Sequence, residues 1–195
     1  GKRYGIIGCA VGAPFAVLIA EELFASGCRF LISMTSAGQI TETRDPPYFV
    51  VIDRALRDEG TSYHYVPPAL WSVADGALVA AVHDDLAGFR VPVDRGASWT
   101  TDAPFRETAT AIRNARDLGV LAVEMEAAAL YAFAQARKRS VLCLAHVTNT
   151  MGSAVLDFEK GESDGVYDAL DVIASARRTW ELRDNITNSV QTAGK

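Results

Sequence analysis

The stretch VLAVEMEAAALYAFAQARKRSVLCLAHV, residues 120–147, predicts a strand, a helix and a second strand in succession. Residues 120–125 and 140–147 are short apolar runs, which is typical of strands covered on both faces. Between them, residues 126–139 are rich in alanine and other helix formers. This succession predicts an α/β fold with a mixed or mostly parallel sheet.

The same alternation continues on both sides of this stretch. Residues 60–76 are rich in Gly, Pro and aromatic side chains, which favours a loop that packs over other parts of the molecule. No repeat or linker divides the chain, so residues 1–195 are expected to form one domain, a three-layer sandwich with helices flanking the central sheet. Further strands are expected at 4–8, 30–34, 49–56 and 91–99, and helices at 15–27, 72–89, 106–119 and 165 to about 190. Because a buried strand is predicted as early as 4–8, we expect an upstream strand and loop to belong to the same fold.

Composition narrows the function classes. The chain has 19 basic and 24 acidic residues, a formal net charge of −5, and no basic block longer than RKR at 137–139, which argues against nucleic acid as a partner. No apolar run is long enough to span a membrane. Cys9, Cys28 and Cys143 lie far apart in apolar surroundings, so we expect reduced core cysteines, no metal site and a cytoplasmic location.

Two glycine-containing turns follow predicted strands. GCAVGAP, residues 8–14, can present backbone N–H groups and a helix N-terminus to an anion, although a tight turn that needs Gly8 and Gly12 is an equally good interpretation. TSAG, residues 35–38, ends the next strand in the same way. Both turns are expected at the carboxyl edge of the sheet, where open α/β folds bind ligands.

Glu124 and Glu126 stand in one of the most apolar parts of the chain. A buried ionised carboxylate costs several kcal/mol unless partners compensate it. One glutamate is explained by the dipole at the start of the helix, but two are explained less well. We therefore expect one to accept hydrogen bonds from ligand hydroxyls and the other to orient protein groups behind it.

These residues carry a resemblance to the nucleoside phosphorylase and nucleosidase superfamily, and most closely to uridine phosphorylase. GVLAVEMEAAALYAFA at 119–134 resembles the family's glutamate signature, and GAPFAVLIAEELFASG at 12–27 and TSAG resemble its glycine-containing segments. RDEGTSYHYVPPALWSVAD at 57–75 and GASWTTD at 96–102 are similar to the corresponding parts of uridine phosphorylase. The resemblance covers nearly the whole chain.

The resemblance implies a nucleoside phosphorylase that uses inorganic phosphate as co-substrate, without an organic cofactor or metal, and that assembles as a homo-oligomer, a dimer or a hexamer. Glu126 would receive the 2′ and 3′ hydroxyls of the ribose beside Met125, and Glu124 would lie behind. The remaining implied site residues are Ser36 and Gly12 for phosphate, and Ala37, Gly38, Thr100, Phe105 and Asn149 for the base. Glu126 and Asn149 are the catalytic candidates.

The chain departs from the family pattern at several positions, among them Phe105, where the stacking aromatic appears one place late. Ser33 stands where phosphorylases of this family have a phosphate-binding arginine, which keeps open a nucleosidase that uses water. Asn149 stands where purine-cleaving members have an acidic residue, and an amide can hydrogen-bond a base but cannot protonate it. Ser33, Asn149 and the absence after Asp102 of the Gln-x-Arg pair with which uridine phosphorylases read uracil together leave a third alternative, a protein that binds nucleosides without cleaving them.

Overall fold

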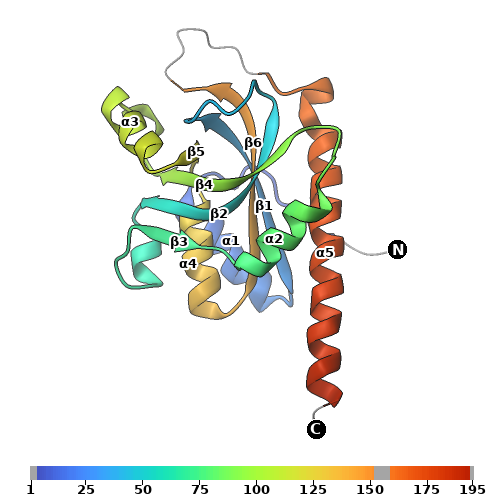
Figure 1. Ribbon diagram of the computed structural model, residues 1–195. Helices are drawn as coiled ribbons and strands as arrows, with labels where there is room; N and C mark the ends of the chain where they lie inside the picture. The colour runs from blue at the N-terminus through green and yellow to red at the C-terminus, as the bar shows by residue number, and fades with distance from the viewer. Residues whose placement is uncertain (1–3, 152–158, 194–195) are drawn as a thin grey trace.

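The computed structural model describes residues 4–151 and 159–193, in which the strand, helix and strand predicted over 120–147 are confirmed as β5, α4 and β6 (Figure 1). The strands are β1 (Phe30–Gln39), β2 (Tyr48–Asp58), β3 (Trp71–Val73), β4 (Val93–Thr101), β5 (Val120–Glu124) and β6 (Ser140–Thr150). The helices are α1 (Ala13–Ala25), α2 (Gly76–Asp85), α3 (Ala109–Asp117), α4 (Ala127–Arg137) and α5 (Val166–Ala193), with short 3₁₀ turns η1 (Ser62–His64), η2 (Pro104–Arg106) and η3 (Glu162–Gly165).

The six strands form one mixed sheet in the order β3-β2-β4-β5-β1-β6. The pairs β1 with β6, β2 with β4, and β4 with β5 are parallel, and β1 with β5 and β2 with β3 are antiparallel. Residues 48–51 of β2 also pair antiparallel with residues 144–147 of β6, which closes five of the strands into a ring. The mixed α/β sheet is thus confirmed, and helices flank it as expected. The expected three-layer sandwich is confirmed only in that respect, because the sheet closes on itself.

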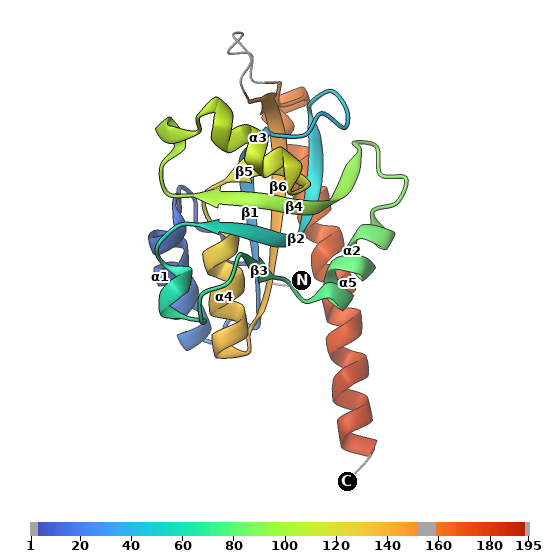
Figure 2. The same ribbon diagram turned by 60° about the vertical axis from the view of Figure 1, so that its left-hand side comes forward.

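Helices cover the sheet on several sides. One buried cluster packs α1 and α4 against Tyr48, Val50 and Ile52 of β2. Another packs α2 and α5 against Phe49 and Val51 of the same strand, and α3 covers β4 and β5. Figure 2 shows α1 and α4 side by side on one side of the sheet and α2 with α5 on the other. Burial of the first half of β2 on both faces explains why residues 48–52 are a continuous apolar run.

The first predicted strand is wrong. Residues 4–8 have no regular structure, and Tyr4, Ile6 and Ile7 are 53%, 83% and 51% exposed. An apolar run becomes a strand only when a neighbouring strand supplies hydrogen bonds, and none of the six strands pairs with this segment. Sequence reasoning also placed Cys9 in the core, but Cys9 is exposed, whereas Cys143 is buried.

Several element boundaries differ from expectation. The TSAG segment is part of β1, which continues to Gln39. Residues 60–76, expected as a loop, contain η1 and the edge strand β3. Helix α2 begins after Asp75, whose carboxylate accepts hydrogen bonds from the N–H groups of Ala77 and Leu78, both at 3.0 Å. The boundary lies later than predicted because β3 uses the residues before this cap.

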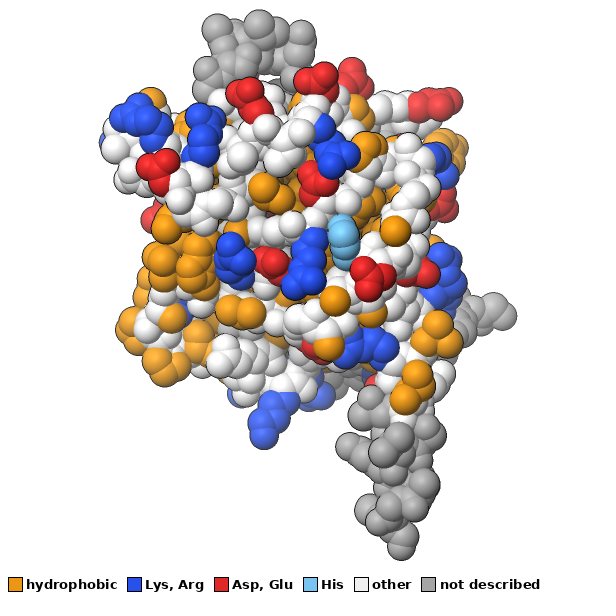
Figure 3. All heavy atoms as spheres, viewed as in Figure 1, with side chains coloured by type: hydrophobic (Ala, Val, Ile, Leu, Met, Phe, Trp, Pro, Cys, Tyr) orange, Lys and Arg blue, Asp and Glu red, His pale blue; other side chains and the backbone are white. Residues whose placement is uncertain are grey.

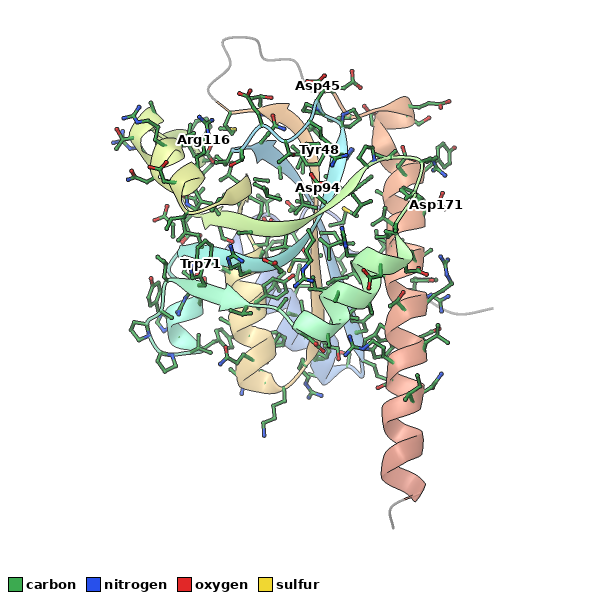
Figure 4. All side chains as sticks on the ribbon, in the orientation of Figure 1. Asp45, Tyr48, Trp71, Asp94, Arg116 and Asp171 are labelled. Atoms are coloured by element: carbon green, nitrogen blue, oxygen red, sulfur yellow. The ribbon has the colours of Figure 1, made fainter. Side chains whose placement is uncertain are left out.

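The molecular surface mixes charges of both signs. On the face seen in Figure 3, acidic and basic side chains are interspersed. Figure 4 places Trp71 of β3 and Asp171 of α5 at opposite sides of the molecule; Asp171 accepts a hydrogen bond from Arg90 at 2.8 Å. Among the described residues, no helix is both long and apolar enough to cross a membrane.

Candidate functional site

The predicted site residues come mostly from the carboxyl ends of four strands. The strand register pairs Gly38 of β1 with both Val123 of β5 and Asn149 of β6, and it pairs Thr100 of β4 with Glu124 of β5. Glu126 follows β5 directly and is the N-cap residue of α4. Residues far apart in the sequence therefore meet at one edge of the sheet.

Glu124 is 3% exposed, and both of its carboxylate oxygens are occupied. Oε2 accepts hydrogen bonds from the N–H groups of Glu126 and Ala127, each at 2.7 Å. Oε1 accepts from the hydroxyls of Ser98, at 3.0 Å, and Thr100. Burial raises the pKa of Glu124 from 4.5 to about 7, the hydrogen bond from Thr100 opposes that rise, and the charge of Glu126 adds to it. Glu124 thus fixes the backbone at the start of α4.

Glu126 is 5% exposed, and its two carboxylate oxygens differ. Oε1 accepts a hydrogen bond from the backbone N–H of Gly12 at 2.7 Å. Oε2 has no hydrogen-bond partner among the described residues. Such an atom is costly to bury, so it marks a position where a hydroxyl donor would be stabilised. Oε2 is shielded from solvent in this structure, and neighbouring side chains must move when a ligand reaches it.

The N–H of Gly12 does bind an anion, but that anion is the protein's own carboxylate. Gly12 caps α1 with a φ of 91°, a backbone conformation that favours glycine. Its expected contact with phosphate remains a prediction, and the donor it would use is already engaged by Glu126.

A row of polar side chains continues from β1 to β6. The hydroxyl oxygens of Ser36 and Thr148 lie 3.2 Å apart, and Thr148 donates to Oδ1 of Asn149 at 3.4 Å. The Asn149 amide lies 3.7 Å from Sδ of Met151, which packs so closely on Gly38 that a β-carbon there would overlap it. Ser36 is exposed and Asn149 is half-buried, so both can meet a ligand.

Four other predicted site residues have different surroundings. Met125 is half-buried between the two glutamates. Ala37 is 4% exposed and packs in the core beneath α1 and α4. Thr100 is fully buried, and its hydroxyl serves Glu124 and the N–H of Ala128. Phe105 is 100% exposed on η2, and the structure does not bring it to the polar row.

A cavity of about 580 Å³ adjoins this row. Gln39, Thr150 and Met151 line one side of it, and residues 42–45 line the other. Gln39 is held by hydrogen bonds from Thr150 and to the carbonyl of Arg44, at 3.0 and 2.7 Å. In the described part of the chain, no group of three or more His, Cys, Asp or Glu side chains is arranged to hold a metal ion.

Sequence reasoning missed Ser98 and Thr148. Ser98 lies two positions before Thr100 on the same face of β4, and both hydroxyls reach Glu124. Thr148 is 1% exposed and links Ser36 to Asn149. The period of two along a strand could have identified Ser98 once Thr100 was singled out.

Comparison with known proteins identifies the family of the chain. Residues 1–177 match the profile of a family described as the phosphorylase superfamily. The chain is 28% identical over 156 residues to a purine nucleoside phosphorylase of the DeoD type from Brevibacillus brevis, and 29% identical over 156 residues to one from an Exiguobacterium species. It is 28% identical over 165 residues to a guanosine phosphorylase from Halorubrum lacusprofundi.

These alignments cover part of each protein. The two purine nucleoside phosphorylases align with 76% of this chain, and the guanosine phosphorylase aligns with 83%. The chain spans 64% of the length of the first two relatives and 66% of the third.

Proposed function

The chain belongs to the phosphorylase superfamily, and on this basis we propose that it cleaves the N-glycosidic bond of ribonucleosides with inorganic phosphate, releasing the free base and ribose 1-phosphate. The observation that carries the proposal is the carboxylate of Glu126. One of its oxygens is fixed by Gly12, and the other is buried without a partner. Such an oxygen suits a sugar hydroxyl as its hydrogen-bond donor.

The proposed chemistry follows from the charges that develop as the bond breaks. Positive charge grows on the ribose, and negative charge grows on the departing base. A fixed carboxylate beside the sugar stabilises the first, and a hydrogen-bond donor beside the base stabilises the second. Glu126 serves the sugar in this proposal, Met125 lies against it, and the Asn149 amide donates to the base.

The phosphate has Ser36 as its proposed protein contact. The hydroxyl of Ser36 is exposed and lies 3.2 Å from that of Thr148, so the pair can donate one hydrogen bond outward while sharing another. Phosphate attacks the anomeric carbon as the base leaves. No organic cofactor or metal is needed for this substitution.

The identity of the base rests on mixed observations. Named relatives are purine nucleoside and guanosine phosphorylases, whereas the middle segment at 57–75 resembles uridine phosphorylase. Gly38, Ala37, Thr100 and Phe105 remain the proposed base contacts from the resemblance. For Phe105 this requires the segment around η2 to close over the ligand, because its ring is fully exposed. We also propose a homo-oligomer, a dimer or hexamer, acting in the cytoplasm.

A second candidate is hydrolysis of the same bond, favoured by Ser33. Ser33 pairs with Cys143 in the ladder between β1 and β6, three positions before Ser36, and it brings no cationic group to the proposed phosphate position. A third candidate, binding without cleavage, is favoured by Ser33 together with Asn149, which cannot act as an acid.

Release of free base from a panel containing uridine, inosine, guanosine and adenosine, with and without phosphate, tests the proposal. Base release that requires phosphate and yields ribose 1-phosphate would support it. Equal release without phosphate would identify a hydrolase. Calorimetric nucleoside binding with no base release over hours would identify a binding protein.

A further inference from the structure

The start of α1 and the start of α4 lie against each other, and each engages a different glutamate. The N–H groups of Glu126 and Ala127, at the start of α4, both donate to Glu124. The N–H of Gly12, at the start of α1, donates to Glu126. Each helix N-terminus therefore faces one carboxylate, which is the favourable orientation of the helix dipole.

Glu126 does not cap its own helix. It is the N-cap residue of α4, yet its side chain makes no capping hydrogen bond there. Glu124 accepts the N–H groups of Glu126 and Ala127, and Thr100 accepts that of Ala128. The Glu126 side chain instead reaches a donor 114 residues away in the sequence. Helix α1 has no side-chain capping hydrogen bond of its own. The Glu126 carboxylate therefore supplies the negative charge at its N-terminus.

Contacts between the two helices hold this donor in place. The rings of Phe24 in α1 and Phe133 in α4 lie 5.6 Å apart. Glu21 of α1 accepts hydrogen bonds from Arg137 of α4, at 2.8 and 2.9 Å, and from Tyr65, at 3.0 Å. Figure 2 shows the two helices running side by side. Gly12, at the start of α1, is thus held in place relative to Glu126, at the start of α4, by contacts between these two helices.

We infer that Gly12 is a positioning residue of the nucleoside site. Its N–H holds Oε1 of Glu126, so that Oε2 is presented to the sugar hydroxyls. The inference rests on the proposed function. It assigns Gly12 a part in ribose recognition, in place of the phosphate contact expected from the sequence, and it predicts that α1 controls the preference for ribonucleosides over 2′-deoxyribonucleosides.

Gly27 provides a matched control. It lies just beyond the other end of α1 with a φ of 94°, close to the 91° of Gly12, and a β-carbon would meet no atom within 4 Å at either position. Alanine therefore places a side chain in a positive-φ conformation at both ends of one helix. Only Gly12 touches Glu126.

The experiment compares kcat/KM of Gly12→Ala, Gly27→Ala and the unmodified full chain for a ribonucleoside and its 2′-deoxy analogue. Strain at Gly12 misplaces a hydrogen bond to a charged group, so we expect Gly12→Ala to lower the ribonucleoside value by roughly tenfold to a hundredfold. We expect the 2′-deoxy value to fall much less, which reduces the preference for ribose. Equal effects of the two variants, or equal loss on both substrates, would overturn the inference. Should Gly12→Ala fail to fold, the contact is tested in a variant that leaves Gly12 unchanged, Glu126→Ala, through the amide proton resonance of Gly12.

A second measurement is independent of turnover. The amide proton resonance of Gly12 should shift upfield in Glu126→Ala, which removes its acceptor, whereas that of Gly27 should not move. An unmoved Gly12 resonance would refute the hydrogen bond itself. An unmodified chain that neither cleaves nor binds any ribonucleoside, yet shows the Gly12 shift, would refute the proposed function while leaving this contact intact.

Discussion

The hydroxyl of Thr100 joins Glu124 to the first turn of α4. It donates to Oε1 of Glu124 and accepts the N–H of Ala128 at 2.9 Å. Together with the two N–H groups held by Glu124, this engages the N–H groups of residues 126–128 with acceptors from the protein itself. Glu124 and Glu126 are therefore divided between a structural task and a proposed ligand-binding task, although they stand only two positions apart.

Thr100→Val tests the structural task. Valine has nearly the same shape but leaves the buried N–H of Ala128 without its acceptor and removes one of the two hydrogen bonds to Oε1 of Glu124, so that only Ser98 still donates to it. We expect a loss of unfolding free energy of roughly 2–3 kcal/mol, measured by urea denaturation. Thr100→Ser retains the hydroxyl and should lose much less. Similar losses in the two variants would show that the hydroxyl is not what matters.

The pKa of Glu124 predicts how stability depends on pH. Because the folded pKa is raised from 4.5 to about 7, the folded protein binds this proton more tightly than the unfolded chain does. The stabilisation is full below about pH 4.5 and is lost as pH rises through about 7, a change on the order of 3 kcal/mol. Glu124→Gln mimics the protonated form, because its amide can donate toward Ser98 and Thr100 while its oxygen accepts the two N–H groups.

Denaturation of both forms at intervals from pH 4.5 to 8 measures this effect. The free energy of unfolding of Glu124→Gln should stay flatter over that range than that of the unmodified chain. Parallel curves would mean that Glu124 does not change protonation on folding there.

Glu126→Gln tests the proposed ligand-binding task of Glu126. The amide oxygen can still accept from Gly12, but the group has lost the negative charge that opposes the positive charge on the sugar. We expect a lower kcat/KM for ribonucleosides, which corresponds to a loss of about 2–4 kcal/mol in transition-state stabilisation. The unfolding free energy should change little. Activity within about twofold of the unmodified chain would contradict the ribose assignment.

Local sequence patterns predicted much of the fold, and long-range pairing explains the rest. The strand, helix and strand of 120–147 carry their own periodicity, so they could be predicted. The closure of the sheet depends on residues 48–51 meeting residues 144–147, which no local pattern encodes. Residues 4–8 have a strand-like composition but no partner strand among those described, so composition alone was misleading there.

Part of the candidate site could likewise be predicted from local sequence, and part depends on long-range contacts. That two glutamates in an apolar stretch need compensation could be predicted from the cost of burying charge. Which groups compensate them could not, because Gly12, Ser98 and Thr100 come from other elements. The resemblance named Thr100 as a base contact, whereas the structure engages its hydroxyl behind the site.

Gly38→Ala tests the close packing between β1 and Met151. A β-carbon at Gly38 would overlap the thioether of Met151 and would touch Val123 at 3.4 Å. We expect a loss of about 1–3 kcal/mol in unfolding free energy, since the flexible methionine can move only partly away. Met151→Ala removes the overlapping side chain. Adding Gly38→Ala to Met151→Ala should therefore lower the unfolding free energy by less than Gly38→Ala lowers it in the unmodified chain. Strictly additive losses would show that the two residues do not meet.

Asn149→Asp tests how the base leaves. Oδ1 of Asn149 already accepts a hydrogen bond from Thr148, and aspartate keeps that acceptor while adding a group that can carry a proton. Purine leaving groups gain from protonation, so we expect the variant to cleave inosine or guanosine at least about tenfold faster below neutral pH, with the gain disappearing as the aspartate ionises. Cleavage of uridine should not gain, because uracil departs without that proton in the proposed scheme. The measurement is kcat/KM against pH for one purine and one pyrimidine nucleoside. An equal fall in kcat/KM for the purine and the pyrimidine nucleoside at every pH would show that position 149 does not face the base. The aspartate would then lower activity only by disturbing the folded structure.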